Sequence, residues 1–108
     1  MREKIREINT IIDEIVMVLR QGYTTEGLKK INNIMPELNS IIMGFIESIP
    51  EYHEKGIDIP QDVIITQLQN MLEGIEYQDC VQLADTLEYE IADRLKVFDE
   101  ILTELGEE

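Results

Sequence analysis

Two pairs of acidic residues have types and spacing that could carry chemistry. Glu73 and Glu76 form the first pair, and Glu90 and Asp93 form the second. The members of each pair stand three positions apart, so they share one face if their segment is helical. Carboxylates on two adjacent helices can hold Mg²⁺ against a substrate phosphate. The pattern therefore indicates a metal-dependent phosphate chemistry as one hypothesis.

This spacing is similar to the E-x-x-E…E-x-x-D pattern of the all-helical MazG-type nucleoside triphosphate pyrophosphohydrolases. The resemblance implies hydrolysis of a nucleotide to its monophosphate and pyrophosphate, with Mg²⁺ as the cofactor. The sequence holds 23 acidic residues, however, so acid-x-x-acid spacings also arise elsewhere in it. Glu90 and Asp93 also lie opposite the apolar stripe of their segment, where a groove between helices is not expected. We keep the enzyme as the alternative and take a non-enzymatic protein without a cofactor as the main interpretation.

The segment that must position the second pair is a long amphipathic helix over residues 79–105. Asp79 is expected to cap its start, with Gln82 at the capping-box position. Arg94 falls within or beside the apolar arc, where it would snorkel, pair with Glu90, or anchor an anionic ligand or partner. The arc has the three- and four-residue steps of a helix face, and it consists of Ala84, Leu87, Ile91, Leu95, Phe98, Leu102 and Leu105.

The remaining chain predicts three more helices, over residues 2–20, about 25–49 and 61–75. Pro36 stands inside the second without interrupting its apolar phase, so we expect a kinked helix there and not two helices. That helix has the widest apolar arc and should be the most buried. Pro50 should end it, and residues 51–59 read as a long connection. The sequence therefore predicts an all-α protein with one domain over residues 1–108, an up-down-up-down four-helix bundle.

In such a bundle the first helix lies antiparallel to the last. This would place the basic residues of the first turns (Arg2, Lys4 and Arg6) opposite the acidic end of the chain (Glu104, Glu107 and Glu108).

The net charge of −14 is unevenly distributed. Residues 1–50 carry a net charge of −1, whereas residues 51–108 carry −13. So acidic a half repels nucleic acid and anionic membranes, and we exclude both as direct partners. The single cysteine permits no internal disulfide, and we find neither a secretion signal nor an apolar run long enough to span a bilayer. We expect a soluble, cytoplasmic protein.

The run Asp79-Cys-Val-x-Leu-Ala-Asp-x-Leu-Glu-Tyr-Glu resembles a family of small acidic helical proteins of Gram-positive bacteria that has no assigned function. Some members lie near motility genes. The resemblance covers about the last fifty residues and implies no catalytic residues. Within the run, Tyr89 and its neighbours Glu88 and Glu90 are the residues least needed for packing of the helix. A tyrosine contributes contact area at low entropic cost, so this position is a candidate contact point for a partner.

Our main functional hypothesis is a protein-binding or assembly module, chaperone-like or associated with motility. It would use an apolar groove with an acidic rim to hold another protein, or a second copy of itself as a homodimer. The apolar arcs of the first two helices exceed what a small monomer needs, and exposed surfaces of that kind mark partner sites. The candidate partner-binding residues are Glu88, Tyr89, Glu90 and Arg94.

Overall fold

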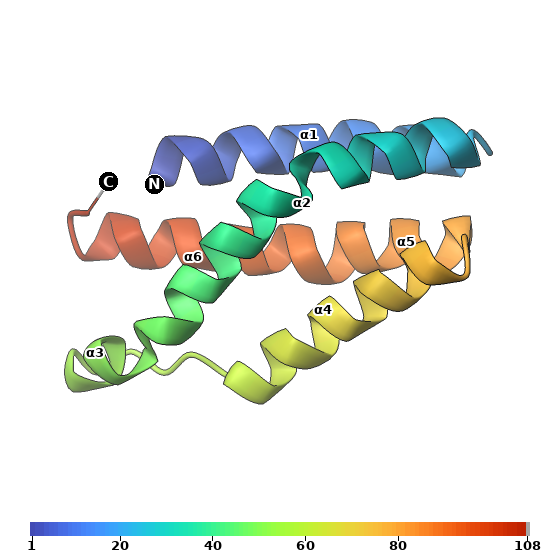
Figure 1. The fold of residues 1–108 in the computed structure, drawn as a ribbon. Helices are drawn as coiled ribbons and strands as arrows, with labels where there is room; N and C mark the ends of the chain where they lie inside the picture. Colours follow the sequence, from blue (N-terminus) through green and yellow to red (C-terminus); the bar gives the residue numbers. More distant parts are fainter. Residues whose placement is uncertain (108) are drawn as a thin grey trace.

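The computed structural model describes residues 1–107, and the regular structure within them is entirely helical. The elements in chain order are α1 (Arg2–Arg20), α2 (Thr24–Glu47), α3 (Ile49–Glu54), α4 (Gln61–Glu76), α5 (Cys80–Thr86), the π-helical turn η1 (Leu87–Ile91) and α6 (Ala92–Glu104) (Figure 1). The last three follow one another without a break, and we call them together the final helix. No helix in the described range combines the length and the apolar character needed to cross a membrane.

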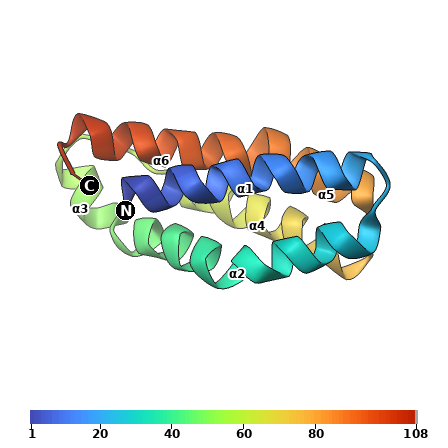
Figure 2. The same ribbon diagram turned by 90° about the horizontal axis from the view of Figure 1, so that it is seen from above.

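Helix α1 occupies the middle of the fold. It packs against α2 on one side and against the final helix on the other, as Figure 2 shows from above. The broad apolar stripe predicted for this helix is therefore used on two neighbours. Helix α4 packs against α5 and η1. The molecule is elongated, with extents of 44 × 25 × 20 Å.

Ion pairs set the antiparallel register of α1 and the final helix. Arg2 and Arg6, at the start of α1, lie 3.5 and 3.0 Å from the carboxylate of Asp99. Arg20, at the other end of α1, lies 3.0 Å from Asp85 in α5. The predicted direction is therefore correct, but Arg2 and Arg6 pair with Asp99 and not with the predicted Glu104 or Glu107.

Two other charges of that prediction have other partners. Lys4 pairs with Glu7 and Glu37. Glu107 lies 4.0 Å from Lys55. Glu108 lies outside the described residues.

The final helix, not α2, buries the most residues. The prediction for α2 is wrong because its outer flanks remain partly exposed, whereas the final helix is covered by both α1 and α4. Helix α2 buries seven residues of its 24. The final helix buries nine residues: Leu83, Ala84, Thr86, Leu87, Ile91, Ala92, Leu95, Phe98 and Leu102.

Helix α2 continues through Pro36, as predicted, and changes direction near its middle in Figure 1. A proline removes one backbone hydrogen bond and crowds the preceding turn, which bends a helix without ending it when packing continues on both sides. The apolar face of α2 does continue, since Ile31 and Leu38 on either side of the proline are fully buried.

The connection predicted for residues 51–59 is partly wrong, because α3 forms there. Pro50 occupies the first turn of α3, where its missing N–H has no intrahelical partner to lose. The ring of Tyr52 is buried and stacks on Phe45, with 5.6 Å between ring centroids, and Phe45 stacks in turn on Phe98 at 3.9 Å. With the final helix counted once, the described chain has five helices and not four.

The final helix begins as predicted but contains a turn that the sequence did not indicate. The Asp79 carboxylate accepts a hydrogen bond of 3.0 Å from the backbone N–H of Gln82. The Gln82 side chain does not complete a capping box, because the Asp79 N–H donates to the carbonyl of Gly74. The Gln82 amide donates instead to the carbonyl of Asn70 and to Glu73. The turn η1 in the middle of the helix is π-helical.

Helix α4 ends at a residue in the left-handed region that is not glycine. Gln78 has a φ of 52°, and its N–H donates to the carbonyl of Ile75 at 3.2 Å, while the Asp79 N–H donates to Gly74 at 2.9 Å. This is the hydrogen-bond pattern of a Schellman motif. Helix α1, α3 and α6 end with the same pattern, but with glycine at the equivalent position.

We predict that Gln78→Gly stabilises the protein, because glycine adopts a positive φ without the steric cost that a β-carbon brings. The expected gain in the free energy of unfolding is up to about 1 kcal/mol, since the greater entropy of glycine in the unfolded chain offsets part of it. Chemical denaturation measures it. As a matched control, Gln69→Gly in the interior of α4 should lower the free energy of unfolding by about 1 kcal/mol. A loss of stability in both variants would contradict the prediction.

Candidate functional site

The π-helical turn η1 carries three of the four residues predicted to bind a partner, Glu88, Tyr89 and Glu90. It lies midway along the final helix, between α1 and α4. A π-turn includes an additional residue and so spreads the neighbouring side chains over a wider arc. Such turns occur frequently at functional sites. We therefore describe the two sides of this turn in detail.

On the side of α1, Glu88 and Tyr89 belong to a surface cluster of charges. The Arg20 guanidinium lies 3.0 Å from Asp85 and 3.5 Å from Glu88. Its hydrogen bond with Asp85 raises the pKa of Arg20. A hydrogen bond with Glu88 raises the pKa of the Tyr89 hydroxyl, whose side chain is 64% exposed. Because the cluster is open to solvent, its contribution to stability is small.

On the side of α4, Glu90 and Arg94 make separate hydrogen bonds. The Asn70 amide donates to the Glu90 carboxylate at 3.2 Å. The Arg94 Nε donates to the side-chain oxygen of Gln67 at 3.2 Å, and partial burial lowers the pKa of Arg94. Arg94 therefore binds a neutral amide of α4 instead of Glu90. A shallow hollow beside this site is lined by Asp62, Val63, Thr66, Gln67 and Glu90.

The four predicted partner-binding residues thus form two groups on opposite flanks of the final helix. Glu88 and Tyr89 lie with the end of α1, whereas Glu90 and Arg94 lie against α4. The structure therefore does not bring all four residues into a single contact patch.

The predicted metal ligands are engaged separately. The Glu73 carboxylate accepts from the Gln82 amide at 3.4 Å, and Glu76 is exposed. Glu90 binds Asn70, and Asp93 lies 3.9 Å from Lys96. Among residues 1–107, the structure contains no group of three or more His, Cys, Asp or Glu side chains that could hold a metal ion.

Asn9 makes a partly buried polar contact that the sequence analysis did not single out. Its amide donates at 3.2 Å to the carbonyl of Ala92, the residue that follows the π-turn. Its side-chain oxygen is buried and has no hydrogen-bond partner among residues 1–107. The sequence did contain a signal for this contact, because Asn9 is a polar residue at the edge of the apolar face of the first helix, next to Ile8.

Helix α4 has an apolar flank that the sequence analysis also missed. Only two of its seven apolar side chains, Ile64 and Met71, are buried. Ile65 is 37% exposed and Leu72 is 50% exposed, and Leu68 between them is half-buried. We call Ile65, Leu68 and Leu72 the α4 stripe.

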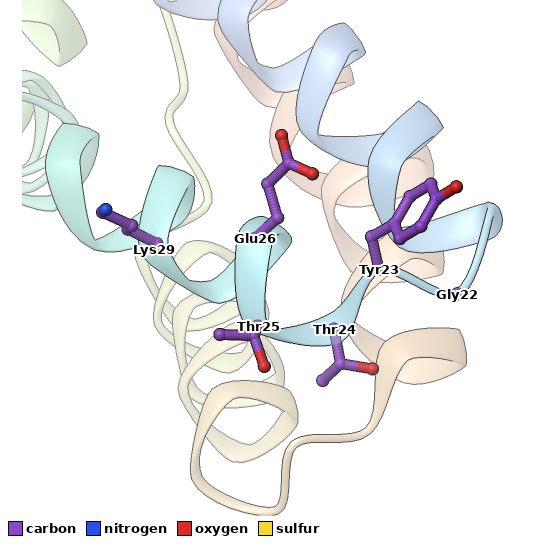
Figure 3. Close-up of a pocket in the computed structure, with 6 residues that line it drawn as sticks. All are labelled: Gly22, Tyr23, Thr24, Thr25, Glu26 and Lys29. Carbon is purple, nitrogen blue, oxygen red and sulfur yellow. The ribbon is translucent and has the colours of Figure 1, made fainter.

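A further hollow surrounds the turn between α1 and α2. It is lined by Gly22, Tyr23, Thr24, Thr25, Glu26 and Lys29 (Figure 3). In Figure 3 these side chains spread outward and do not point toward one another. The Thr24 hydroxyl lies 2.9 Å from the Cys80 sulfur, which links this turn to the start of α5. Nothing in this arrangement brings a nucleophile together with a base.

We predict that Mg²⁺ raises the melting temperature of the wild type and of the double variant Glu90→Gln/Asp93→Asn to the same extent. The reason is that a divalent cation screens the repulsion within a chain of net charge −14 without occupying a specific site. Thermal melts with and without the ion measure this. An increase present in the wild type and lost in the variant would instead support the paired-carboxylate enzyme.

We also predict that Asn9→Asp lowers the free energy of unfolding by about 2 kcal/mol, because a carboxylate cannot donate to the Ala92 carbonyl. The folded state would raise the pKa of the new carboxyl, since only its protonated form can donate. The deficit should therefore be largest at about pH 7 and shrink as the pH falls through that raised pKa. Chemical denaturation at about pH 7 and at a pH below the raised pKa measures the two free energies of unfolding. Asn33→Asp, at an exposed position of α2, is the control and should change stability by no more than about 0.5 kcal/mol. Equal effects of the two substitutions would refute the role of Asn9.

Comparison with known proteins places the chain in one family. No curated protein matches it, and no solved structure matches it. A family model described as "Domain of unknown function (DUF8042)" matches residues 1–101. This agrees with the resemblance to a family that has no assigned function. Because the match covers most of the sequence, the chain belongs to the DUF8042 family.

Proposed function

We propose that the chain is a non-enzymatic, cytoplasmic protein-binding or assembly module whose docking surface is the α4 stripe. The observation that carries the proposal is the poor burial of α4. This helix buries two of its seven apolar side chains, whereas α1 buries six of nine and α2 buries six of ten. The scaffold of the proposal is an up-down-up-down bundle of α1, α2, α4 and the final helix, with α3 inserted between α2 and α4.

The stripe lies on the flank of α4 that does not pack against the final helix. Its three residues recur at steps of three and four, so they form one line along the helix. The other flank provides the contacts to the final helix. There Gly74 approaches Leu83 so closely that a β-carbon would lie 3.1 Å from the Leu83 Cα, and Asn70 donates to Glu90.

Covering the stripe would release free energy. Complete burial of a leucine or isoleucine side chain contributes about 1.5–3 kcal/mol relative to full exposure. Ile65 and Leu72 have already lost between half and two thirds of their exposure, so a partner would gain roughly 1 kcal/mol from each. This gain is large enough to select one surface over another, and exposed apolar surfaces of this kind mark interaction sites.

The proposal relocates the surplus apolar surface that the sequence analysis assigned to the first two helices. Most of those residues form the core between α1, α2 and the final helix. Tyr89 lies away from the stripe, on the flank that faces the end of α1. We retain it as a separate contact point, with Glu88 as its neighbour.

We predict that the folded protein enhances the fluorescence of Nile red, an uncharged apolar dye, and that Ile65→Ser/Leu72→Gln removes the enhancement. The substitutions leave the net charge unchanged, so a loss reports on apolar surface alone. Val63→Asn is the matched control, because Val63 is 47% exposed on the opposite flank of the same helix and should keep the signal. Enhancement that survives in the double variant would contradict the proposal.

Sedimentation of the same three proteins tests whether the partner is a second copy. If the stripe forms a homodimer, the wild type and Val63→Asn should sediment as dimers and the double variant as a monomer. A monomer in all three would leave another protein as the partner.

A further inference from the structure

From the charges around the stripe, we infer that the partner is a basic amphipathic helix lying along α4. This inference rests on the proposed function, since it names the chemistry of the partner that the stripe would hold. Helix α4 carries Asp62, Glu73 and Glu76 and contains no lysine or arginine. It is therefore acidic at both ends, and its residues 63–72 carry no charge.

The carboxylates bracket the stripe. Asp62 stands three residues before Ile65, and Glu76 stands four residues after Leu72, so both lie near the line of the stripe at its two ends. Glu73 follows Leu72 in the sequence and accepts a hydrogen bond from Gln82 of the final helix. All three are exposed, and within residues 1–107 none of them has an ion-pair partner.

Some acids elsewhere in the fold do have such partners. Asp85, Glu88 and Asp99 on the final helix all pair with arginines of α1. On α4, carboxylates without an ion-pair partner therefore flank the incompletely buried apolar residues, and a partner with cations and an apolar face would contact both.

The dimensions of the surface suit a helix. The stripe from Ile65 to Leu72 is about 10 Å long, and the distance from Asp62 to Glu76 along α4 is about 21 Å. A partner helix of about four turns would place apolar residues at i, i+3 or i+4 and i+7 on the stripe, with Lys or Arg toward both ends. The cations would meet the three carboxylates at the rim of the contact, where they mainly steer association and fix register.

Other occupants fit less well. A small molecule is held in a concave pocket, and the two hollows described above do not include a residue of the stripe. A second copy of the chain would bring two acidic α4 helices together, which like charges oppose. Nucleic acid and anionic membranes are repelled for the same reason.

The test uses a designed helical peptide of about 18 residues made only of Lys and Leu, with its leucines at i, i+3, i+4 and i+7. A fluorescent label reports binding to the whole protein by anisotropy at low and high salt. Two comparison peptides complete the set. One has the same composition in scrambled order, and the other has Glu in place of Lys.

We expect the basic amphipathic peptide to bind at least about tenfold more tightly than either comparison peptide, and to weaken as salt rises. Ile65→Ser/Leu72→Gln should weaken binding by about tenfold or more, while Val63→Asn should change it less than about threefold.

Charge reversal separates local from general attraction. Asp62→Lys/Glu73→Lys/Glu76→Lys should weaken binding by about tenfold or more. The matched variant Glu3→Lys/Asp13→Lys/Glu14→Lys changes the net charge equally on α1 and should have a clearly smaller effect. All six carboxylates are exposed and have no ion-pair partner in the described part of the chain. The two variants therefore differ in where the charge lies, and in the hydrogen bond from Gln82 that Glu73→Lys removes.

Three results would overturn the inference: equal binding of the scrambled peptide, equal binding of the Glu-containing peptide, or equal effects of the two charge reversals. A failure here can be told apart from a failure of the proposed function. If Nile red still reports the stripe, the docking surface stands and only the nature of its partner is wrong. If Ile65→Ser/Leu72→Gln changes neither the dye fluorescence nor the binding of the peptide, the proposed function fails as well.

Discussion

The antiparallel contact between α1 and the final helix is the interaction on which the rest of the structure depends. Both helices contribute buried apolar residues to it, and ion pairs fix its two ends, from Arg2 and Arg6 to Asp99 and from Arg20 to Asp85. Helix α2 then covers α1, and α4 covers α5 and η1. Exposed ion pairs add little free energy. Their effect is to select one register among the several that two apolar stripes would allow.

The π-turn decides where the candidate functional residues lie. The buried positions Thr86 and Leu87 are followed by Ile91 and Ala92, each five residues later, which is the step of a π-helical hydrogen bond and not of an α-helix. Through this turn the final helix keeps α1 on one flank and α4 on the other. Glu88 and Tyr89 consequently meet Arg20, whereas Glu90 meets Asn70.

Helical periodicity predicted the bounds of α1 and the final helix closely, because an apolar stripe and its end signals are local properties. It could not reveal α3, whose six residues are too few to show a period and depend on the stacking of Tyr52 against Phe45. The π-turn was hidden because the apolar residues around it still follow three- and four-residue steps. Periodicity also identifies which face of a helix is apolar but not which neighbour covers it. For this reason the incompletely buried surface was assigned to the first two helices instead of α4.

The uneven charge of the chain has a structural explanation that bears on function. Six of the nine Lys and Arg residues lie in the first fifty positions, and the three arginines of α1 compensate carboxylates of the final helix across the central contact. The acidic excess of residues 51–108 is therefore partly neutralised where the final helix meets α1, but it is not neutralised on α4. If the acids served solubility alone, they would need no relation to the apolar residues. On α4 they stand at both ends of the stripe, which is the arrangement that a basic helix with an apolar face would recognise.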